Sequence, residues 1–311
     1  MHAAIVTEFD RPPQYRECTE PTAGPGQQVM DVVAAALHPR VRSQADGSHY
    51  TSTGVLPLVP GVDAVVRDQG GRLRYALLRG AASGSFADRV AVDERRSVPL
   101  PAGTDPLLAA AAINPVLSAW VALRRRIEFR PGSSVLVLGA TGAAGRTALR
   151  TAKRFGAGEV IGAGRDETRL AALAAAGADR VLRLDQLAAA ADVDVVLDYV
   201  WGEPAAAGMS DIIRHRRDRD RPLTWVSIGS VAGADSPIPS AALRAARLQI
   251  VGSGIGSVPG EEIAAEIPAI VAAVAEGDYD LQPVPVPLAG VKDAWSRRVA
   301  GGERIVFVPE R

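Results

Sequence analysis

Residues 135–157 read VLVLGATGAAGRTALRTAKRFGA. An apolar run typical of a buried strand leads directly into a glycine-rich turn, and the turn leads into an amphipathic helix. In such a turn Gly142 lets the backbone approach a pyrophosphate and Gly145 permits close packing of the helix, whose N-terminus offers amide groups and a positive dipole. Because strand, turn, helix and a following strand occur in order, the stretch predicts a dinucleotide-binding βαβ unit.

The end of the following strand, VIGAGRD at residues 160–166, indicates which dinucleotide is bound. A site for NAD places a carboxylate there to hold the ribose 2′-hydroxyl, but this chain has Gly164 and Arg165. A guanidinium suits a 2′-phosphate, so we expect NADPH, with Arg169 and Lys153 as further cations. In the alternative, Arg165 is a solvated loop residue and Asp166 holds the ribose.

Strand and helix patterns alternate from about residue 114 to residue 256, and the strands are continuously apolar. This pattern predicts a doubly wound parallel sheet with helices on both faces. The expected strands are 134–138, 160–163, 180–182, 193–198, 223–228 and 248–252. The expected helices are 117–127, which links the two regions, 143–155, 167–176 and 204–214.

The first third of the chain predicts a different kind of domain, because short strand patterns are interrupted by Pro and Gly. These strands are expected over residues 3–7, 28–36, 62–67, 73–78 and 86–92. A helix over 261–275 and a strand over 304–308 are expected to return to this region. We therefore predict a β-rich substrate domain from residues 1–113 and 257–311, and a nucleotide domain from residues 114–256.

The composition excludes several classes of function. With 35 basic and 35 acidic residues among 311, no excess charge calls for nucleic acid or an anionic membrane. The apolar stretches are shorter than the roughly 20 residues of a spanning helix, and the start lacks the features of a signal peptide, so we expect a cytoplasmic protein. Cys18 is the only cysteine, so no internal disulfide can form. The charged run RHRRDRDR at 214–221 is expected to be a solvated loop.

Several further segments carry a resemblance to a known family: MHAAIVTEFDRPPQY, LPLVPGVDAVV, AAAINPVLSAWVALRRRIEFRPGSSVLVLGATGAAG, DVDVVLDYVWG, LTWVSIGSVAG and LQIVGSGIGS. Their order resembles the medium-chain dehydrogenase/reductase superfamily, in particular its zinc-independent quinone oxidoreductase and enone reductase branch. Short-chain and NmrA-like proteins also carry GATGxxG, but there the motif opens the chain, whereas about 130 residues precede it here.

The zinc-dependent alcohol dehydrogenases of that superfamily use an early Cys and a His-Glu pair, but the matching stretches here read AALHP and VPGVDAV. The four histidines, His2, His38, His49 and His215, lack the spacing of a metal site. We therefore expect no metal. The sequence also lacks the GxSxG elbow of serine hydrolases.

The resemblance implies a Rossmann domain with a GroES-like substrate domain. It also implies hydride transfer from NADPH to a quinone or to the activated C=C of an α,β-unsaturated carbonyl. Tyr50 and His38 are the implied catalytic residues, although His38 stands where the family has Asn and could be an ordinary histidine before Pro39. Tyr50 could likewise be an amphipathic residue that closes a loop.

The resemblance further implies a substrate cleft and a cofactor site. The cleft residues are Asn114, Ser118 and Trp201; helix capping is the alternative role for Asn114 and Ser118. The cofactor residues are Ala140, Thr141, Gly142, Ala143, Ala144, Gly145, Gly164, Arg165, Arg169, Val200, Ile228, Gly229, Ser230 and Gly252.

Three other questions stay open at this point. Family members often pair two chains through a sheet edge, so a homodimer is expected, with residues 248–251 as the edge strand. Two other functions are compatible with the sequence, a reductase of another biosynthetic intermediate such as an imine, and a non-catalytic NADPH-binding sensor or partner protein. The small-molecule substrate cannot be read from the fold.

Overall fold

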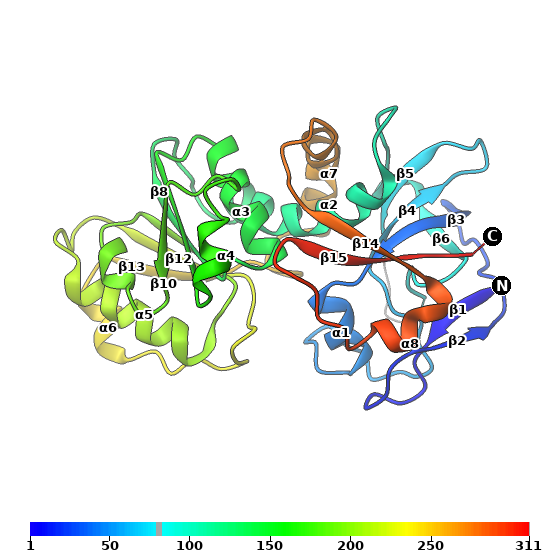
Figure 1. Cartoon of the computed structure of the whole chain (residues 1–311), viewed down its shortest axis with the longest axis horizontal. Coiled ribbons are helices and arrows are strands. Elements are labelled where there is room, and N and C mark those ends of the chain that lie inside the picture. Colours follow the sequence, from blue (N-terminus) through cyan, green and yellow to red (C-terminus); the bar gives the residue numbers. More distant parts are fainter. Residues whose placement is uncertain (79–82, 311) are drawn as a thin grey trace. The chain divides into compact units, whose positions relative to one another are not determined.

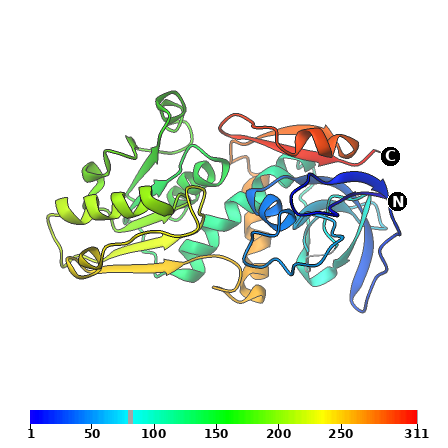
Figure 2. The same cartoon turned by 90° about the horizontal axis from the view of Figure 1, so that it is seen from below.

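The computed structural model describes residues 1–78 and 83–310, and the chain forms two compact units (Figure 1). The first unit comprises Met1–Asn114 and Ile267–Arg311, and the second comprises Pro115–Glu266. The chain returns to the first unit at Ile267. The sequence pattern predicted this boundary earlier, at residue 257. Both ends of the chain belong to the first unit, as Figure 2 shows.

The second unit is built on a parallel sheet of six strands, counted over Pro115–Glu266, all of which the structure describes. The strands are β8 (Ser134–Leu138), β9 (Glu159–Gly164), β10 (Arg180–Arg183), β11 (Val195–Asp198), β12 (Leu223–Ser227) and β13 (Leu248–Gly252). Their order is β10-β9-β8-β11-β12-β13. The direction of winding reverses between β8 and β11, and open α/β sheets bind ligands at the carboxyl ends of the strands at this point.

Helices cover both faces of this sheet, as the doubly wound pattern predicts (Figure 1). Alternate residues of β8 face opposite sides, so Val135 and Val137 pack with α3 (Ala143–Arg154), whereas Leu136 and Leu138 pack with α5 (Gly202–His215). The shorter helices of the unit are α4 (Glu167–Ala171), α6 (Ser240–Arg244) and the 3₁₀ turn Leu187–Ala190. Helix α4 ends earlier than the helix expected over 167–176.

The first unit contains a mixed sheet of seven strands in its described part, in the order β14-β15-β3-β4-β5-β7 with β6 paired to β3. These strands are β3 (Gln27–Ala36), β4 (Asp63–Arg67), β5 (Leu73–Leu77), β6 (Arg89–Asp93), β7 (Ser97–Pro99), β14 (Gln282–Pro287) and β15 (Glu303–Val308). A separate hairpin joins β1 (His2–Ile5) to β2 (Gln14–Glu17). Strand β15 pairs with β3, so the last strand of the chain completes the sheet that the first third begins.

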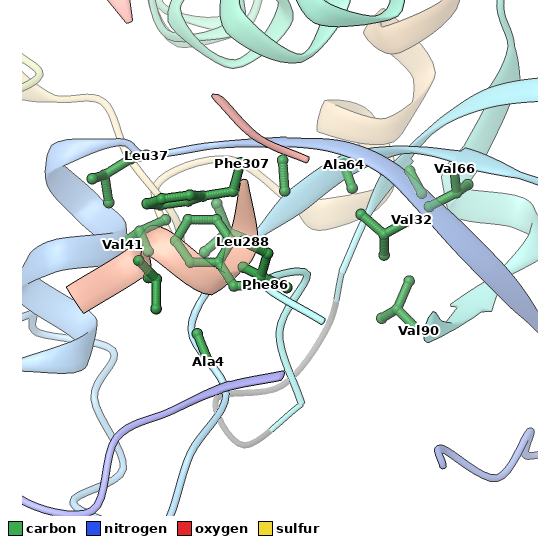
Figure 3. Packing of buried hydrophobic residues seen from close by; sticks show 14 of the residues in the cluster. Ala4, Val32, Leu37, Val41, Ala64, Val66, Phe86, Val90, Leu288 and Phe307 are labelled. Carbon is green, nitrogen blue, oxygen red and sulfur yellow. The ribbon is translucent and has the colours of Figure 1, made fainter. Parts of the chain in front are cut away.

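Two aromatic rings form the centre of the core of the first unit (Figure 3). Phe86 and Phe307 meet edge to face with ring centroids 4.9 Å apart, and both are fully buried. Burying one such ring contributes about 1.5–3 kcal/mol. Leu288 packs on them, and Val41 joins from α1 (Pro39–Ala45). This core therefore holds both β15 and α1 in place.

The remaining helices lie near the residues at which the chain passes from one unit to the other, or close to the C-terminus. Helix α2 (Pro106–Val121) begins well before the linking helix expected from residue 117 and continues into a π-helical turn, Ala122–Arg126. By length and composition the stretch Pro106–Arg126 could cross a membrane, but most of it is buried in the protein, as in a core helix. Helix α7 is Gly260–Ala275 and α8 is Val291–Ala294. The short 3₁₀ turns are Glu94–Arg96 and Leu288–Gly290.

The charged run 214–221 is not wholly solvated, as the sequence suggested, because Arg216 is buried. Its guanidinium donates to four carbonyl oxygens, those of Ala191, Val193, Arg221 and Pro222. These carbonyl oxygens accept the hydrogen bonds that the guanidinium of a solvated loop residue would donate to water. The expectation was wrong for Arg216, which fastens the segment before β12.

We predict that Gly145→Ala destabilises the protein by about 1–3 kcal/mol, because overpacking forces backbone to shift. A Cβ at Gly145 would lie 2.3 Å from the carbonyl oxygen of Gly139. The matched control is Gly142→Ala, whose Cβ would lie 3.5 Å from the same atom. Urea unfolding measures both variants, and an equal loss of stability in the two would contradict the prediction.

Candidate functional site

The glycine-rich turn follows β8 directly and begins helix α3. Gly139 has φ +79°, and its carbonyl oxygen accepts a hydrogen bond from Gly142 N at 3.1 Å. Gly142 is the N-cap residue of α3, so Ala143, Ala144 and Gly145 form its first turn. The first amide groups of a helix have no partner within the helix, and they carry its positive dipole end. This turn can therefore receive an anionic group at the end of β8.

The end of β11 lies beside the same turn. A Cβ added to Gly139 would lie 3.2 Å from Val200 Cγ2 and 3.4 Å from Tyr199 Cβ. On the other side of β11, the amides of Ile228 and Gly229 donate to the carbonyl oxygen of Asp198 at 2.8 and 3.1 Å. The structure therefore brings Val200, Ile228 and Gly229 together with the glycine-rich turn at one edge of the sheet.

Asp198 shapes the loop that follows β11. Its Oδ1 accepts from the amides of Val200 (2.7 Å) and Trp201 (2.9 Å), and its Oδ2 accepts from the indole Nε1 of Trp225 at 2.9 Å. Burial raises the pKa of Asp198, although the hydrogen bonds from Trp201, Trp225 and Val200 oppose that shift. Trp201 is held at φ +53° and ψ −161°, a region that glycine favours and that costs other residues about 1–3 kcal/mol.

Ser118 is also fixed near this loop. Its Oγ donates to the carbonyl oxygen of Pro115 at 2.7 Å, so the hydroxyl of Tyr199 donates to it at 3.0 Å. Ser118 lies in the last turns of α2 and caps no helix there. Two predicted cofactor residues lie farther along the same edge: Ser230 is exposed after β12, and Gly252 ends β13.

The end of β9 carries the residues expected to select the cofactor. Gly164 is buried at the last position of the strand, and Arg165 is exposed immediately after it. Asp166 is the N-cap of α4: its Oδ1 accepts from Arg169 N at 3.0 Å, and its Oδ2 lies 3.8 Å from Arg169 Nε. Asp166 therefore has a structural role, while Arg165 carries its charge into solvent.

Lys153 does not belong with these residues, contrary to our expectation. Its ammonium lies 2.5 Å from Asp179 Oδ2, and the same oxygen accepts from the amide of Val160 at the beginning of β9. Gly164 is at the other end of that strand, about 13 Å away at 3.3 Å per residue. Lys153 was wrongly expected to reach the 2′-phosphate because residue spacing along a helix does not show which end of the sheet a side chain reaches.

A buried polar cluster forms a second candidate site, within the first unit. His38 is 2% exposed, and its Nε2 lies 3.0 Å from Asp63 Oδ1. Arg304, from β15, places Nη1 2.6 Å from His38 Nδ1. The hydroxyl of Tyr75 and the side chain of Asn114 donate to Asp63 as well. The cluster joins strands β4, β5 and β15 to the residue before α1.

The hydrogen bonds define the protonation state of His38. A guanidinium can only donate, so Nδ1 of His38 is the acceptor and Nε2 carries the proton given to Asp63. Burial lowers the pKa of His38, although Asp63 opposes the shift, and His38 is therefore neutral. Burial disfavours the charge of Asp63, but His38 and the hydrogen bonds of Tyr75 and Asn114 hold its pKa below the usual value.

The predicted catalytic residues are thus placed very differently. His38 is enclosed by Asp63 and Arg304, whereas the side chain of Tyr50 is 70% exposed and its ring stacks on His49 with centroids 4.4 Å apart. Asn114 and His38 both form hydrogen bonds with Asp63. Asn114 is not the N-cap of α2, which begins at Pro106. Catalysis by Tyr50 or His38 stays a prediction.

Sequence reasoning missed Asp63, Arg304 and Asp198 as members of these sites. The signal was present, because each is a charged residue next to a run of apolar residues, as in DAVV, RIVFV and VVLD. A buried charge is costly unless it is paired or hydrogen-bonded, so such a residue indicates a polar network. Within the described residues, no group of three or more His, Cys, Asp or Glu is placed to hold a metal ion.

Comparison with known proteins finds relatives that are named quinone reductases or oxidoreductases. No protein-family model matches the chain. The chain is 31% identical, over 99% of its length and all of the relative, to a probable NADPH-dependent quinone reductase, tdiC, of Emericella nidulans. Its fold is similar to the quinone oxidoreductase of Thermus thermophilus, solved alone and with NADPH, with a TM-score of 0.83, 26% identity and coverage of 99% of this chain and 100% of that chain. A probable oxidoreductase from Mycobacterium abscessus matches with a TM-score of 0.79, 26% identity and 99% coverage of both chains.

We predict that His38 makes stability depend on pH. Its folded pKa is lowered, so below about pH 6.5 the unfolded chain binds a proton that the folded protein does not. The free energy of unfolding should therefore fall as pH drops below about 6.5, by up to about 1.4 kcal/mol per pH unit from this group. Urea unfolding of the natural protein and of His38→Gln between pH 8 and pH 5 measures this. The difference between the two proteins should change below pH 6.5, and a constant difference would contradict the assignment.

Proposed function

Since this chain belongs to the quinone oxidoreductase branch of the medium-chain dehydrogenase/reductase superfamily, we propose that it is an NADPH-dependent oxidoreductase that reduces a quinone or the activated C=C of an α,β-unsaturated carbonyl. The observation that carries the proposal is the glycine-rich turn at the point where the sheet order reverses, between β8 and β11. Dinucleotide sites occur at this point of doubly wound sheets.

The residues of the second unit fit NADPH. The close approach of Gly145 to the carbonyl of Gly139 leaves no room for a side chain there, which brings the first amides of α3 to the end of β8. These amides suit a pyrophosphate. At the end of β9, Gly164 and the exposed Arg165 suit a ribose 2′-phosphate, with Arg169 one turn away. We assign Ala140, Thr141, Val200, Ile228, Gly229, Ser230 and Gly252 to the same binding edge.

The chain's own residues would then orient the acceptor and balance its charge. When bound, NADPH supplies the hydride. We assign Tyr50 as the donor of a hydrogen bond or proton to the acceptor oxygen, because its side chain is largely exposed. Such a donor stabilises charge that develops in the transition state. We assign His38 a positioning role, because it is neutral, enclosed and bonded at both ring nitrogens. Asn114, Ser118 and Trp201 are assigned to substrate binding.

Two other functions remain as alternatives for the same scaffold. One is reduction of another intermediate such as an imine, and the other is NADPH sensing without turnover. The relative named a quinone reductase favours the proposed acceptors. Incubation with NADPH and a panel of quinones, enones and cyclic imines separates the three by which compound, if any, causes loss of absorbance at 340 nm.

We also propose a cytoplasmic homodimer. One cysteine in the whole chain accords with a reducing compartment. Strand β13 is at an edge of the sheet in the second unit, so its outer backbone groups could pair with those of a second copy. Light scattering coupled to gel filtration tests the dimer. The mass of one chain is 32.4 kDa, so a dimer should have twice that mass in solution.

We predict that the protein binds NADPH more tightly than NADH and that Arg165→Gln reduces this preference by about 1–3 kcal/mol, because a charge-assisted hydrogen bond is lost. Affinity for NADH should stay the same. The control is Arg180→Gln, which removes an exposed arginine from β10 that pairs with Glu159. Fluorescence titration measures both cofactors, and equal affinity of the natural protein for NADPH and NADH would contradict the assignment.

We predict that activity requires no zinc. Val62 and Asp63 occupy the VPGVDAV stretch that matches the His-Glu pair of zinc enzymes, and Asp63 is already bonded to three side chains. Metal analysis of the purified protein should find far less than one zinc per chain, and exhaustive chelation should leave turnover unchanged. One zinc per chain, with activity lost on chelation, would overturn the prediction.

A further inference from the structure

The buried cluster of the first unit contains more positive than negative charge. Asp63 is its one carboxylate among the described residues, and it faces two guanidinium groups, those of Arg304 and Arg40. His38 is neutral, as its hydrogen bonds require. One negative charge therefore balances only one of two cations, and an unbalanced charge removed from water is costly.

Arg304 is the more deeply buried of the two cations. It is 7% exposed, and its Nη1 donates to His38, which donates in turn to Asp63. Asp63 also accepts hydrogen bonds from Tyr75 and Asn114. With these three donors, the carboxylate has little capacity left for a further guanidinium.

Arg40 is the cation closer to solvent. It follows His38 by two residues, in the first turn of α1, and is partly buried. Its Nε, like that of Arg304, is buried without a hydrogen-bond partner, and no ion pair joins Arg40 to a carboxylate in the part of the chain that the structure describes. Burial lowers the pKa of Arg40, because water does not fully solvate its charge.

The groups near Arg40 also offer donors and an aromatic surface. His49 Nδ1 accepts from the amide of Thr51 at 3.2 Å, so its proton is on Nε2. Burial and, secondly, the charge of Arg40 lower the pKa of His49 and keep it neutral. Tyr50, which interacts electrostatically with Arg40, stacks its exposed ring on His49.

We propose that Arg40 is a specificity-determining residue that binds an anionic oxygen of the substrate, so that the preferred acceptors are conjugated or aromatic compounds carrying a carboxylate or an equivalent acidic group. Arg40 is partly exposed and forms no ion pair with a carboxylate among the described residues, so its guanidinium suits such an oxygen. The rings of His49 and Tyr50 suit the flat body of the molecule. This proposal rests on the proposed function for the identity of the ligand as substrate, but the cation and its surroundings belong to the first unit alone.

The test uses 1-naphthoate and its neutral counterpart 1-naphthamide as probes, titrated into the full chain by calorimetry with and without NADPH. We expect the natural protein to bind the acid at least tenfold more tightly than the amide. Arg40→Gln should abolish that preference, Arg40→Lys should restore part of it, and NADPH affinity should stay unchanged in both.

Arg42→Gln is the matched control, because Arg42 is on the same helix and is also partly buried, but its guanidinium lies over the ring of Trp295 at 5.6 Å. It should retain the preference for the acid. Equal binding of acid and amide by the natural protein would overturn the proposal, as would an unchanged preference in Arg40→Gln. A loss of NADPH affinity in Arg40→Gln would also overturn it, by assigning the cation to a cofactor phosphate.

Failure of the proposed function has a different result. In that case NADPH would not bind or would not be consumed with any acceptor, whereas the naphthoate titration without NADPH would still report on Arg40. The two proposals can therefore fail separately.

Discussion

The close packing of α3 against the turn that ends β8 is the contact on which the second unit depends. An added Cβ at Gly145 would lie 2.3 Å from the carbonyl oxygen of Gly139, so only glycine lets the helix begin there. The helix then starts at the carboxyl edge of the sheet, beside the end of β11, where the strand order reverses. The placement of Val200, Ile228 and Gly229 follows, because they come directly after the ends of β11 and β12 at the same edge. The strained conformation of Trp201 is part of this arrangement, since Asp198 fixes the amides of Val200 and Trp201.

The first unit is organised by a buried charge network in addition to its apolar core. Asp63, His38 and Arg304 come from segments far apart in the sequence, and their hydrogen bonds join the last strand to the beginning of α1. Breaking a buried ion network by removing one member typically costs about 3–5 kcal/mol. The network also explains why His38 is neutral and enclosed, because both of its ring nitrogens are bonded within it. Among the described residues Arg40 forms no ion pair with a carboxylate, which links the architecture of this unit to the proposed recognition of an acidic substrate.

The elements with strong periodicity could be predicted from the sequence, and those formed by tertiary context could not. The strands over 134–138 and 248–252 and the start of α3 occur where they were expected. Strand β14 was missed because QPVPVP contains three prolines, which remove ladder donors; it is tolerated because β14 is at the edge of its sheet. Helix α1 has only seven residues, and it is held by packing of Val41 and Ala45 and not by helix propensity.

The candidate site was predictable to a similar degree. The glycine-rich turn follows a local pattern, so its position between the strand over 134–138 and the start of α3 was correctly expected. The reach of a side chain across the sheet is not local, and Lys153 was therefore assigned to the wrong end of β9. The partners of His38 come from β4 and β15, which no local pattern connects. The role that we propose for Arg40 can be inferred only from the charged groups that the folded chain places around it.

The central claim is that this chain transfers a hydride from NADPH to an organic acceptor. A single-turnover experiment tests it most directly, in which the protein with bound NADPH is mixed with a quinone and absorbance at 340 nm is followed. With NADPH carrying deuterium at the transferred C4 position, the account predicts a slower decay and deuterium in the reduced acceptor or, after exchange, in solvent. Binding of NADPH without any loss of absorbance for quinones and enones would contradict the account and favour a sensor.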